Sequence, residues 1–590
     1  MDIVTIVCQL IAGLGAFLIG VKLLSDNMEK LAATRLKDFF HRKPKDKTAF
    51  LPEDLSGLSD EERADRIAAA ERAEIRSRRL NTVASRLSGV GIGTVTTAIV
   101  QSSSLTTVMI VGLVNAGVMS LSYATSLIMG ANIGTCITGL IAALQEFPVA
   151  IIATALAGIG IFVALFSKKE KVVTASMAVA GLGLVFIGLE LMAESMAAVR
   201  ESDVITNAFA SIDNPFLLFF LGIAVTGIVQ SSSAVTSILI SMAAAGIIIG
   251  DSSNSVMFVV LGTNIGTCVT ALISSIGTNI NARRAAVIHL LFNVIGSVIF
   301  FIILLLWDDM VDVTLGVWFK GLPSMQIAMF HTFFNIVCTI IFLPFNDLFV
   351  KAAVFLVRER KKKGETNAEI APVSNRLDKR LLATPAIAVD NASAEAADTL
   401  KLAVKCLSDA VDGFLSADRE SIERIAVAKE GIAERSAAIG DYLTKISAYD
   451  ATLENERRIT ALHSCVGDIN RVAELAENVG KYTRRSIKDD LRFSSVVRDE
   501  IKDMTGLIVS MSEKSAAVLE GGSATAPEEA AEIEERIDAK RKSLMKDHLK
   551  RLGSGECRPE SSGVFINLVC NLERVGDHLN YIANSGETFQ

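Results

Sequence analysis

Long apolar runs with few charges dominate the first 350 residues of the chain and alternate with short polar segments. Crossing a hydrocarbon core of roughly 30 Å takes about 20 helical residues. Seven runs are long enough: 3–24, 121–144, 148–166, 174–195, 255–276, 285–306 and 325–349. The pattern therefore predicts an all-α, polytopic membrane domain over residues 1–350.

Two further apolar stretches, 86–117 and 215–247, are each interrupted midway by Gln-Ser-Ser-Ser. Polar side chains in hydrocarbon are costly unless they face protein, a cavity or a ligand. We therefore expect two re-entrant hairpins with the tetrapeptides at their tips. The alternative is close helix packing, for which serine is common in membrane bundles. The duplicated glutamine favours a site, because packing does not require an amide.

Three segments recur in the same order along this domain. Residues 13–20 match 181–188, residues 99–104 match 228–233, and residues 130–136 match 262–268. Repeat one then covers about 3–166 and repeat two about 174–349. An odd number of crossings separates their starts, so the second copy enters the membrane from the opposite side. Inverted repeats with broken helices are typical of secondary transporters, whose sites lie near the bilayer midplane.

Basic residues near the predicted helix ends fall on one side of the membrane. With the N-terminus outside, the inner loops are 36–85, 167–171 and 282–284, and the tail starts with the basic run 358–363. Lys and Arg are enriched in cytoplasmic loops. We expect an integral protein of a bacterial plasma (inner) membrane, retained in full from its first apolar run, with a cytoplasmic C-terminal region.

Composition separates this membrane part from a soluble part. The whole chain is 51% hydrophobic and 21% charged, and the charges concentrate in 36–85 and 351–590. The segment 36–85 is expected to be a cytoplasmic helical insertion, 351–384 a linker, and 385–590 a bundle of amphipathic helices. The net charge of −7 is spread over the polar segments, so nucleic acid is not an expected partner. The eight scattered cysteines suggest neither a disulfide framework nor a zinc site.

The two hairpin tips suggest an ion site. Serine hydroxyls and free backbone N–H groups at helix N-termini donate hydrogen bonds to anions. Hydroxyl, carbonyl and asparagine oxygens are ligands for sodium. One site between the repeats could hold both ions.

The paired Gln-Ser-Ser-Ser, each followed by Gly-x-Asn-Ile-Gly-Thr, resembles the type II sodium/phosphate cotransporter family, including bacterial members with a PhoU-like domain. The resemblance implies phosphate as substrate and sodium as coupling ion in the lipid bilayer. It places phosphate at Gln101, Ser102, Ser103, Ser104, Gln230, Ser231, Ser232 and Ser233. It places sodium at Thr106, Asn132, Thr135, Thr236, Asn264 and Thr267.

Two His-x-x-Phe-Asn units, 289–293 and 331–335, both lie in the second half of the membrane domain. Units of this kind recur in the resembled family, yet none follows the first Gly-Ala-Asn-Ile-Gly-Thr here. The alternative to an ion-coupling role is that these polar residues bridge helices. They are not part of the expected site.

The soluble tail contains the related segments 468–474 and 571–577, about 103 residues apart, which resemble the PhoU family. That resemblance implies a divalent metal held by carboxylates at Asp468, Glu474, Glu573 and Asp577. The alternative is that Arg471 and Arg574 pair with these acids. Residues 521–527 are expected to link the two halves. A homodimer and a regulatory protein partner for the tail are further expectations.

These features lead to one hypothesis and two alternatives. The hypothesis is a sodium-coupled phosphate transporter that works by alternating access and is regulated by its tail. The alternatives are an exporter of the same fold and a membrane phosphate sensor that does not transport. The chain has no Gly-rich phosphate-binding loop ending in Gly-Lys-Ser/Thr and no recognisable nucleophile motif, so we do not expect an enzyme.

Overall fold

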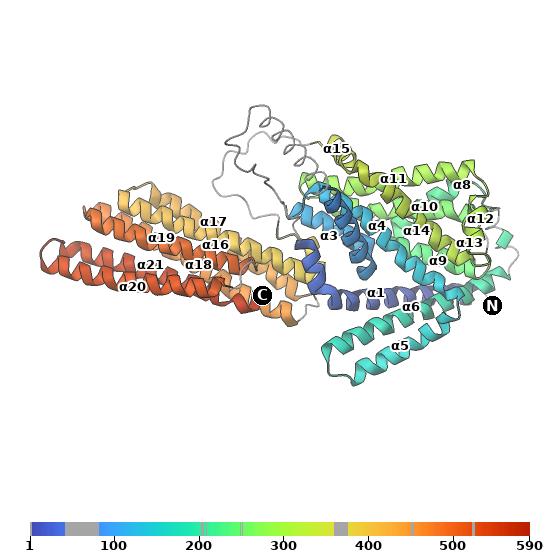
Figure 1. The fold of residues 1–590 in the computed structure, drawn as a ribbon, viewed down its shortest axis with the longest axis horizontal. Helices are drawn as coiled ribbons and strands as arrows, with labels where there is room; N and C mark the ends of the chain where they lie inside the picture. The colour runs from blue at the N-terminus through green and yellow to red at the C-terminus, as the bar shows by residue number, and fades with distance from the viewer. Residues whose placement is uncertain are drawn as a thin grey trace, which may run out of the picture. The chain divides into compact units, whose positions relative to one another are not determined.

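The computed structural model of the chain divides into two units, Met1–Arg360 and Lys361–Gln590, each taken here by itself (Figure 1). It describes residues 3–41, 82–201, 206–207, 209, 211–247, 249–250, 252–358, 376–449, 453–521 and 525–589. Most of the expected insertion 36–85, half of the expected linker 351–384 and part of the 521–527 link lie outside the described residues. The described elements are helices, which confirms the all-α prediction.

The first unit begins with α1 (Ile3–His41) and a helix over Thr82–Val100. Its other elements follow in chain order: α3 (Ser103–Asn115), α4 (Leu121–Ala143), η1 (Leu144–Glu146), α5 (Val149–Phe166), α6 (Glu170–Arg200), α8 (Pro215–Val229), α9 (Ser232–Ala244), α10 (Ser255–Ser274), α11 (Ile280–Leu306), α12 (Met310–Val313), α13 (Leu315–Trp318), α14 (Pro323–Phe342), η2 (Leu343–Phe345) and α15 (Asn346–Leu356). Figure 1 shows these helices running alongside one another.

Seven of the described helices are long and apolar enough to cross a membrane, the number predicted. One member of the set differs. The helix Thr82–Val100 qualifies, because the first arm of its hairpin is 19 residues long. The expected run 148–166 instead forms one of the shorter apolar helices. Both predicted hairpins are observed as a helix, a break at the tetrapeptide and a second helix.

Glycines bring matched helices into backbone contact in both copies. A methyl group at Gly130 would overlap the carbonyl oxygen of Val90, so α4 lies directly against the Thr82–Val100 helix. A methyl group at Gly262 would overlap the carbonyl oxygen of Phe219, so α10 lies against α8 in the same way. Small residues permit such close approach in membranes, where packing and hydrogen bonds replace the hydrophobic effect as driving forces.

The repeated segments 13–20 and 181–188 pack against each other. A methyl group at Gly20 would reach the backbone of Val185, and one at Gly181 would reach the backbone of Leu24. These glycines make α1 and α6 a closely packed pair. The first duplicated motif is therefore explained by packing, as small-residue motifs in membrane helices often are.

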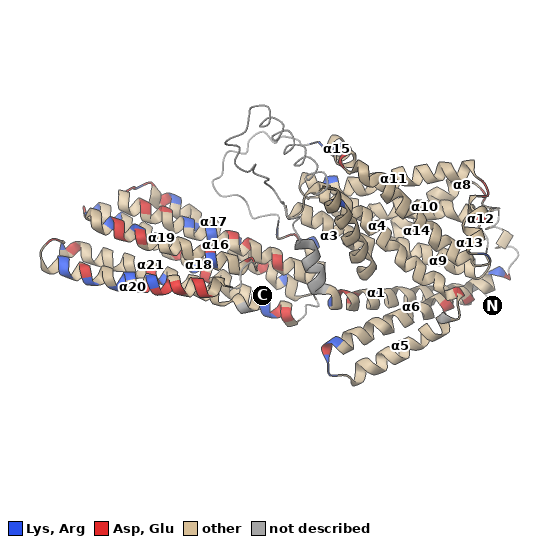
Figure 2. Cartoon of the chain, viewed as in Figure 1, with Lys and Arg blue, Asp and Glu red and all other residues tan. Residues whose placement is uncertain are grey.

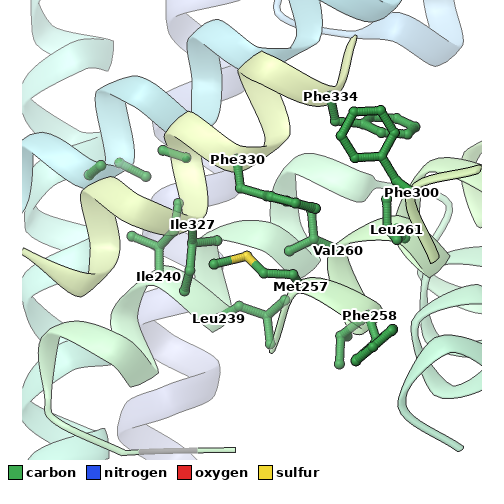
Figure 3. Packing of buried hydrophobic residues seen from close by; sticks show 14 of the residues in the cluster. Leu239, Ile240, Met257, Phe258, Val260, Leu261, Phe300, Ile327, Phe330 and Phe334 are labelled. Atoms are coloured by element: carbon green, nitrogen blue, oxygen red, sulfur yellow. The ribbon is translucent and has the colours of Figure 1, made fainter. Parts of the chain in front are cut away.

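The apolar core of the first unit lies between α9, α10, α11 and α14 (Figure 3). The ring of Phe300 on α11 contacts those of Phe330 and Phe334 on α14, with centroids 6.2 and 5.1 Å apart. Edge-to-face pairs of this kind stabilise a core beyond their buried area. Charged side chains are sparse on these helices (Figure 2). The core also includes Phe17 of α1 and Met129 of α4, so it joins elements of both repeats.

The second unit starts with η3 (Lys379–Ala383) and continues through seven helices: α16 (Pro385–Ser416), α17 (Ser421–Ser447), α18 (Leu453–Lys488), α19 (Ser495–Leu519), α20 (Ala526–Gly553), α21 (Pro559–Asn584) and α22 (Gly586–Phe589). Helices α16–α18 pack together, as do α19–α21, and α16 and α18 contact α19 and α21. The unit is thus a pair of three-helix repeats, and the related segments 468–474 and 571–577 lie on the third helix of each, α18 and α21. Figure 2 shows its helices striped with charge, as expected for amphipathic helices in water.

Candidate functional site

Both tetrapeptides form the same local structure at the tip of their hairpins. The preceding helix ends at a glutamine in the left-handed region, with φ 54° at Gln101 and 58° at Gln230. The next residue caps the following helix: Ser102 accepts a hydrogen bond from Leu105 N, and Ser231 accepts one from Ala234 N. Helices α3 and α9 therefore start inside the apolar domain, with N-terminal N–H groups and positive dipole ends that favour anions.

The predicted site residues lie in the two breaks and on four helices that pack across the two copies. Ser103 and Thr106 are buried on α3, and Ser232 and Thr236 are buried on α9. The predicted sodium residues of the Gly-x-Asn-Ile-Gly-Thr segments are buried on α4 (Asn132, Thr135) and α10 (Asn264, Thr267). Both α4 and α10 contact α3 and α9. The structure thus brings residues of both copies into one helix group, as the inverted repeat predicts.

Several buried polar atoms in this helix group have no hydrogen-bond partner within the described part of the chain. They include the hydroxyl oxygens of Thr107, Thr236 and Ser237 and Nδ2 of Asn132, and the Thr97 hydroxyl oxygen on the adjoining Thr82–Val100 helix is also unpartnered. Buried polar groups in native proteins are nearly always paired with protein, water or a ligand. Their concentration here identifies the region as a candidate ligand site. Roles of individual residues toward phosphate or sodium stay predictions.

Asparagine–cysteine contacts stabilise each copy and were missed by the sequence analysis. In the second copy, Nδ2 of Asn293 on α11 donates to Sγ of Cys268 on α10 at 3.4 Å, and that thiol donates to the carbonyl of His289 at 3.7 Å. In the first copy, Asn335 on α14 donates to Cys136 on α4 at 3.4 Å. The cysteines are structural partners of the His-x-x-Phe-Asn units, a role that their scattered spacing does not reveal.

Helix α14 therefore supplies the unit that the sequence lacks after the first Gly-Ala-Asn-Ile-Gly-Thr. The agreement between α11 and α14 continues one helical turn beyond their His-x-x-Phe-Asn units. Ser297 on α11 donates to the carbonyl of Leu261, and Thr339 on α14 donates to the carbonyl of Met129, which occupies the matching place in α4. Each Gly-x-Asn-Ile-Gly-Thr helix thus has a His-x-x-Phe-Asn helix beside it. The bridging alternative for these units is what the structure shows.

In the second unit, three of the four carboxylates predicted to bind metal have other partners. Asp468 lies 2.9 Å from Nδ1 of His578, and Glu474 pairs with Arg471 as the alternative predicted. Glu573 pairs with Arg541 at 3.4 Å, where the alternative had Arg574. Within the described ranges, no three His, Cys, Asp or Glu residues group closely enough to hold a metal ion.

Glu573 lies in an acidic environment on α21. Partial burial, and then the charge of Asp577, raise the pKa of its carboxyl, while Arg541 acts in the opposite direction. Burial and the charges of Asp538 and Asp577 likewise raise the pKa of Glu534 on α20. The carboxylates on these two helices therefore destabilise one another's charged forms. A divalent metal at this position stays a prediction.

Comparison with protein families gives two matches. The Na+/Pi-cotransporter family matches residues 64–194 and again 195–326. The PhoU domain family matches residues 398–483 and again 501–585. Each match occurs twice, in agreement with a twofold repeat in each unit.

Relatives of the chain include YjbB of Escherichia coli, which is named for inorganic phosphate export. It is 24% identical over 522 residues, which cover 86% of this chain and 92% of YjbB. YqeW of Bacillus subtilis is 30% identical over 270 residues, 45% of this chain and 83% of YqeW. Rabbit sodium-dependent phosphate transport protein 2A is 42% identical over 64 residues, 11% of this chain and 10% of that protein.

Proposed function

The chain belongs to the Na+/Pi-cotransporter family and carries a PhoU domain, and from this premise we propose that it moves inorganic phosphate across a membrane, coupled to sodium, by alternating access. One observation carries the proposal. Two matched helix N-termini, those of α3 and α9, start at serine caps within the membrane-spanning unit. They supply the hydrogen-bond donors and partial positive charge that a phosphate requires.

Sodium coupling has an electrostatic rationale. A phosphate anion in a site of low dielectric constant is costly unless a cation lies nearby. The carbonyls and hydroxyls of the Gly-x-Asn-Ile-Gly-Thr helices offer oxygen ligands beside the tips. The name of the matched family supports sodium as that cation.

We place the protein in a bacterial plasma membrane with the PhoU-like unit in the cytoplasm. This orientation follows from the basic segments 167–171 and 282–284 on the side of the tail. In that position the tail would respond to cytoplasmic phosphate status, directly or through a partner protein. A thiol-reactive reagent that cannot cross membranes should label a cysteine introduced at Ser167 only after the cells have been permeabilised.

The proposal is tested by radiolabelled phosphate flux in liposomes, with sodium and proton gradients varied independently. We expect flux that depends on sodium and is lost in the Ser103→Ala/Ser232→Ala variant. A proton gradient alone should not drive it. Phosphate binding without flux under any gradient would instead identify a sensor.

Export is a second candidate for the physiological direction, because YjbB is named for inorganic phosphate export. The same fold runs in either direction according to the gradients. Cells loaded with labelled phosphate and then diluted into phosphate-free medium distinguish the two. Faster loss of label on expression of the chain supports export, whereas faster accumulation from dilute phosphate supports uptake.

A further inference from the structure

The two hairpin tips share a backbone structure but differ in their surroundings. We call Val100–Ser104 tip 1 and Val229–Ser233 tip 2. In tip 1, Gln101 is buried, its Oε1 accepts a hydrogen bond from Thr138 Oγ1 of α4 at 2.8 Å, and its Nε2 donates to the carbonyl of Ala98. In tip 2, the corresponding Gln230 is exposed.

The residue that corresponds to Thr138 is Thr270 on α10. Its hydroxyl oxygen is buried and has no partner among the described residues. The second copy therefore has both members of the glutamine–threonine pair, but the pair is not formed. Leaving a buried hydroxyl unpaired is costly, so this arrangement must be compensated elsewhere.

A second pair of contacts differs in the same way. Nε2 of His331 lies 3.0 Å from Oδ1 of Asn264, so α14, which packs beside α4 of the first copy, reaches across to α10 of the second. The matching residues are His289 on α11 and Asn132 on α4. The side chains of His289 and Asn132 are not hydrogen-bonded to each other, and His289 Nδ1 and Asn132 Nδ2 are buried without a partner in the described chain.

The long helix α1 adds a third difference. The Ser25 hydroxyl donates to the carbonyl of Val100, the residue just before the break in tip 1, and the Val100 side chain is buried. By the repeat alignment, the residue of α6 that matches Ser25 is Ala193, which has no hydroxyl, and Val229 of tip 2 is exposed. Tip 1 is thus held by two contacts, Gln101–Thr138 and Ser25–Val100, that tip 2 lacks or has unformed.

We propose that Thr138 and Thr270 are positioning residues that hold the two tips alternately, and that His331 and His289 make matched contacts to α10 and α4 that alternate with them. In the state described, Gln101–Thr138 and His331–Asn264 are formed. In the opposite state these separate, while Gln230–Thr270 and His289–Asn132 form. The inference rests on the proposed alternating access, because inverted repeats exchange their conformations as the site changes the side to which it opens. It adds the residues that carry the exchange.

The test is hydrogen exchange of tip 1 in the full-length protein in lipid nanodiscs, followed by mass spectrometry. Thr138→Val removes a hydroxyl that is bonded only in the state described, so exchange at tip 1 should become about fivefold faster. Thr270→Val removes a hydroxyl that is bonded only in the opposite state, so exchange at tip 1 should become about fivefold slower. Fivefold corresponds to about 1 kcal/mol, the typical contribution of one hydrogen bond.

The Thr270→Val result decides the proposal, because a local structural role would leave tip 1 on the other hairpin unchanged. Unchanged or faster exchange at tip 1 in that variant would overturn it. Thr138→Ser keeps the hydroxyl and should reproduce the wild-type rate. If either valine variant fails to fold, His331→Phe and His289→Phe provide the same comparison, with faster and slower exchange expected respectively.

This experiment uses no ion gradient and is independent of the flux assay. If Thr138→Val speeds and Thr270→Val slows exchange at tip 1, but the protein shows no phosphate flux, the alternation of the tips is supported and the proposed transport is wrong. If flux depends on sodium but Thr270→Val and His289→Phe leave exchange at tip 1 unchanged, transport is supported and the alternation of the tips is wrong.

Discussion

The two copies of the membrane unit make the same contacts from different parts of the chain. In the second copy, α10 receives its His-x-x-Phe-Asn partner from α11, the next long helix along the chain. In the first copy, α4 receives it from α14, about 200 residues away. The asparagine–cysteine distance is 3.4 Å in both. The repeat is therefore more complete in the structure than in the sequence. The first copy obtains its His-x-x-Phe-Asn partner only from the second half of the unit.

The largest expected effect comes from removing one tip serine in each copy. Ser103→Ala with Ser232→Ala should reduce phosphate flux by about 100-fold or more, since a hydrogen bond to a charged group contributes about 1.5–3 kcal/mol. If the two copies contribute equally, Ser103→Ala alone and Ser232→Ala alone should reduce phosphate flux by similar factors. Flux in liposomes at matched protein density measures this, and normal flux in the double variant would remove the tips from the site.

Next in size is the close helix packing within each copy. Gly130→Ala and Gly262→Ala should each destabilise the protein by about 1–3 kcal/mol, because the added methyl overlaps a backbone carbonyl. Gly91→Ala is the control, since a methyl group there meets open space, although Gly91 lies on the Thr82–Val100 helix that α4 packs against. Thermal unfolding in detergent should show equal losses in the first two variants and none in the third. Unequal losses would indicate that one copy packs less tightly.

The equivalence of α11 and α14 predicts a smaller, matched pair of effects. Asn293→Ala and Asn335→Ala each remove a donor to a thiol and to a histidine carbonyl. We expect each to cost about 1–2 kcal/mol, given the modest strength of hydrogen bonds between membrane helices. Unfolding temperatures should fall by similar amounts. A loss confined to Asn293→Ala would mean that α14 does not substitute for the missing unit.

The smallest expected effect distinguishes the two copies of the tail. Asn470 in the first copy corresponds to Glu573 in the second, whose pKa is raised by burial and by Asp577. The folded state therefore holds this proton to a higher pH than the unfolded state, and the stability of the fold decreases as the pH rises through the ordinary titration range of a glutamate carboxyl. After correction for the intrinsic pH dependence of amide exchange, the protection of α21 should fall as the pH rises through and above that range. Glu573→Gln should weaken that dependence.

A tail metal would change this last result. Added divalent cation should then slow exchange across α21 in the wild-type protein and leave Glu573→Gln unaffected. Without such a site, the cation has no selective effect on either protein.

The hairpins and the repeats were predictable because their signals are local. A polar tetrapeptide in an apolar run marks a break wherever it occurs, and its duplication with Gly-x-Asn-Ile-Gly-Thr places the copies in register. The helix Thr82–Val100 was harder to recognise as a spanning candidate, because its first residues adjoin a charged segment that conceals where the helix begins. The boundaries of the repeats along the chain remain a prediction.

The contacts around the tips could not be predicted in this way. Thr138 lies on α4, 37 residues from Gln101, and the Cys136–Asn335 contact spans 199 residues. Such pairs depend on how helices cross, which no spacing in the sequence encodes. For the same reason, the cysteines were set aside when only disulfide and metal spacings were considered, and the substitution of α14 for a missing segment went unrecognised.

The left-handed glutamines have a consequence for how these tips tolerate change. A side chain larger than that of glycine or asparagine is disfavoured in this conformation, by roughly 1–2 kcal/mol per residue. Both tips nevertheless have glutamine there, with φ 54° and 58°. Glycine would suit the backbone better, so Gln101→Gly and Gln230→Gly relax the main chain while deleting the whole side chain. If these variants lose activity although their backbone is relaxed, the glutamine side chain and not the conformation of the turn is what the tip requires.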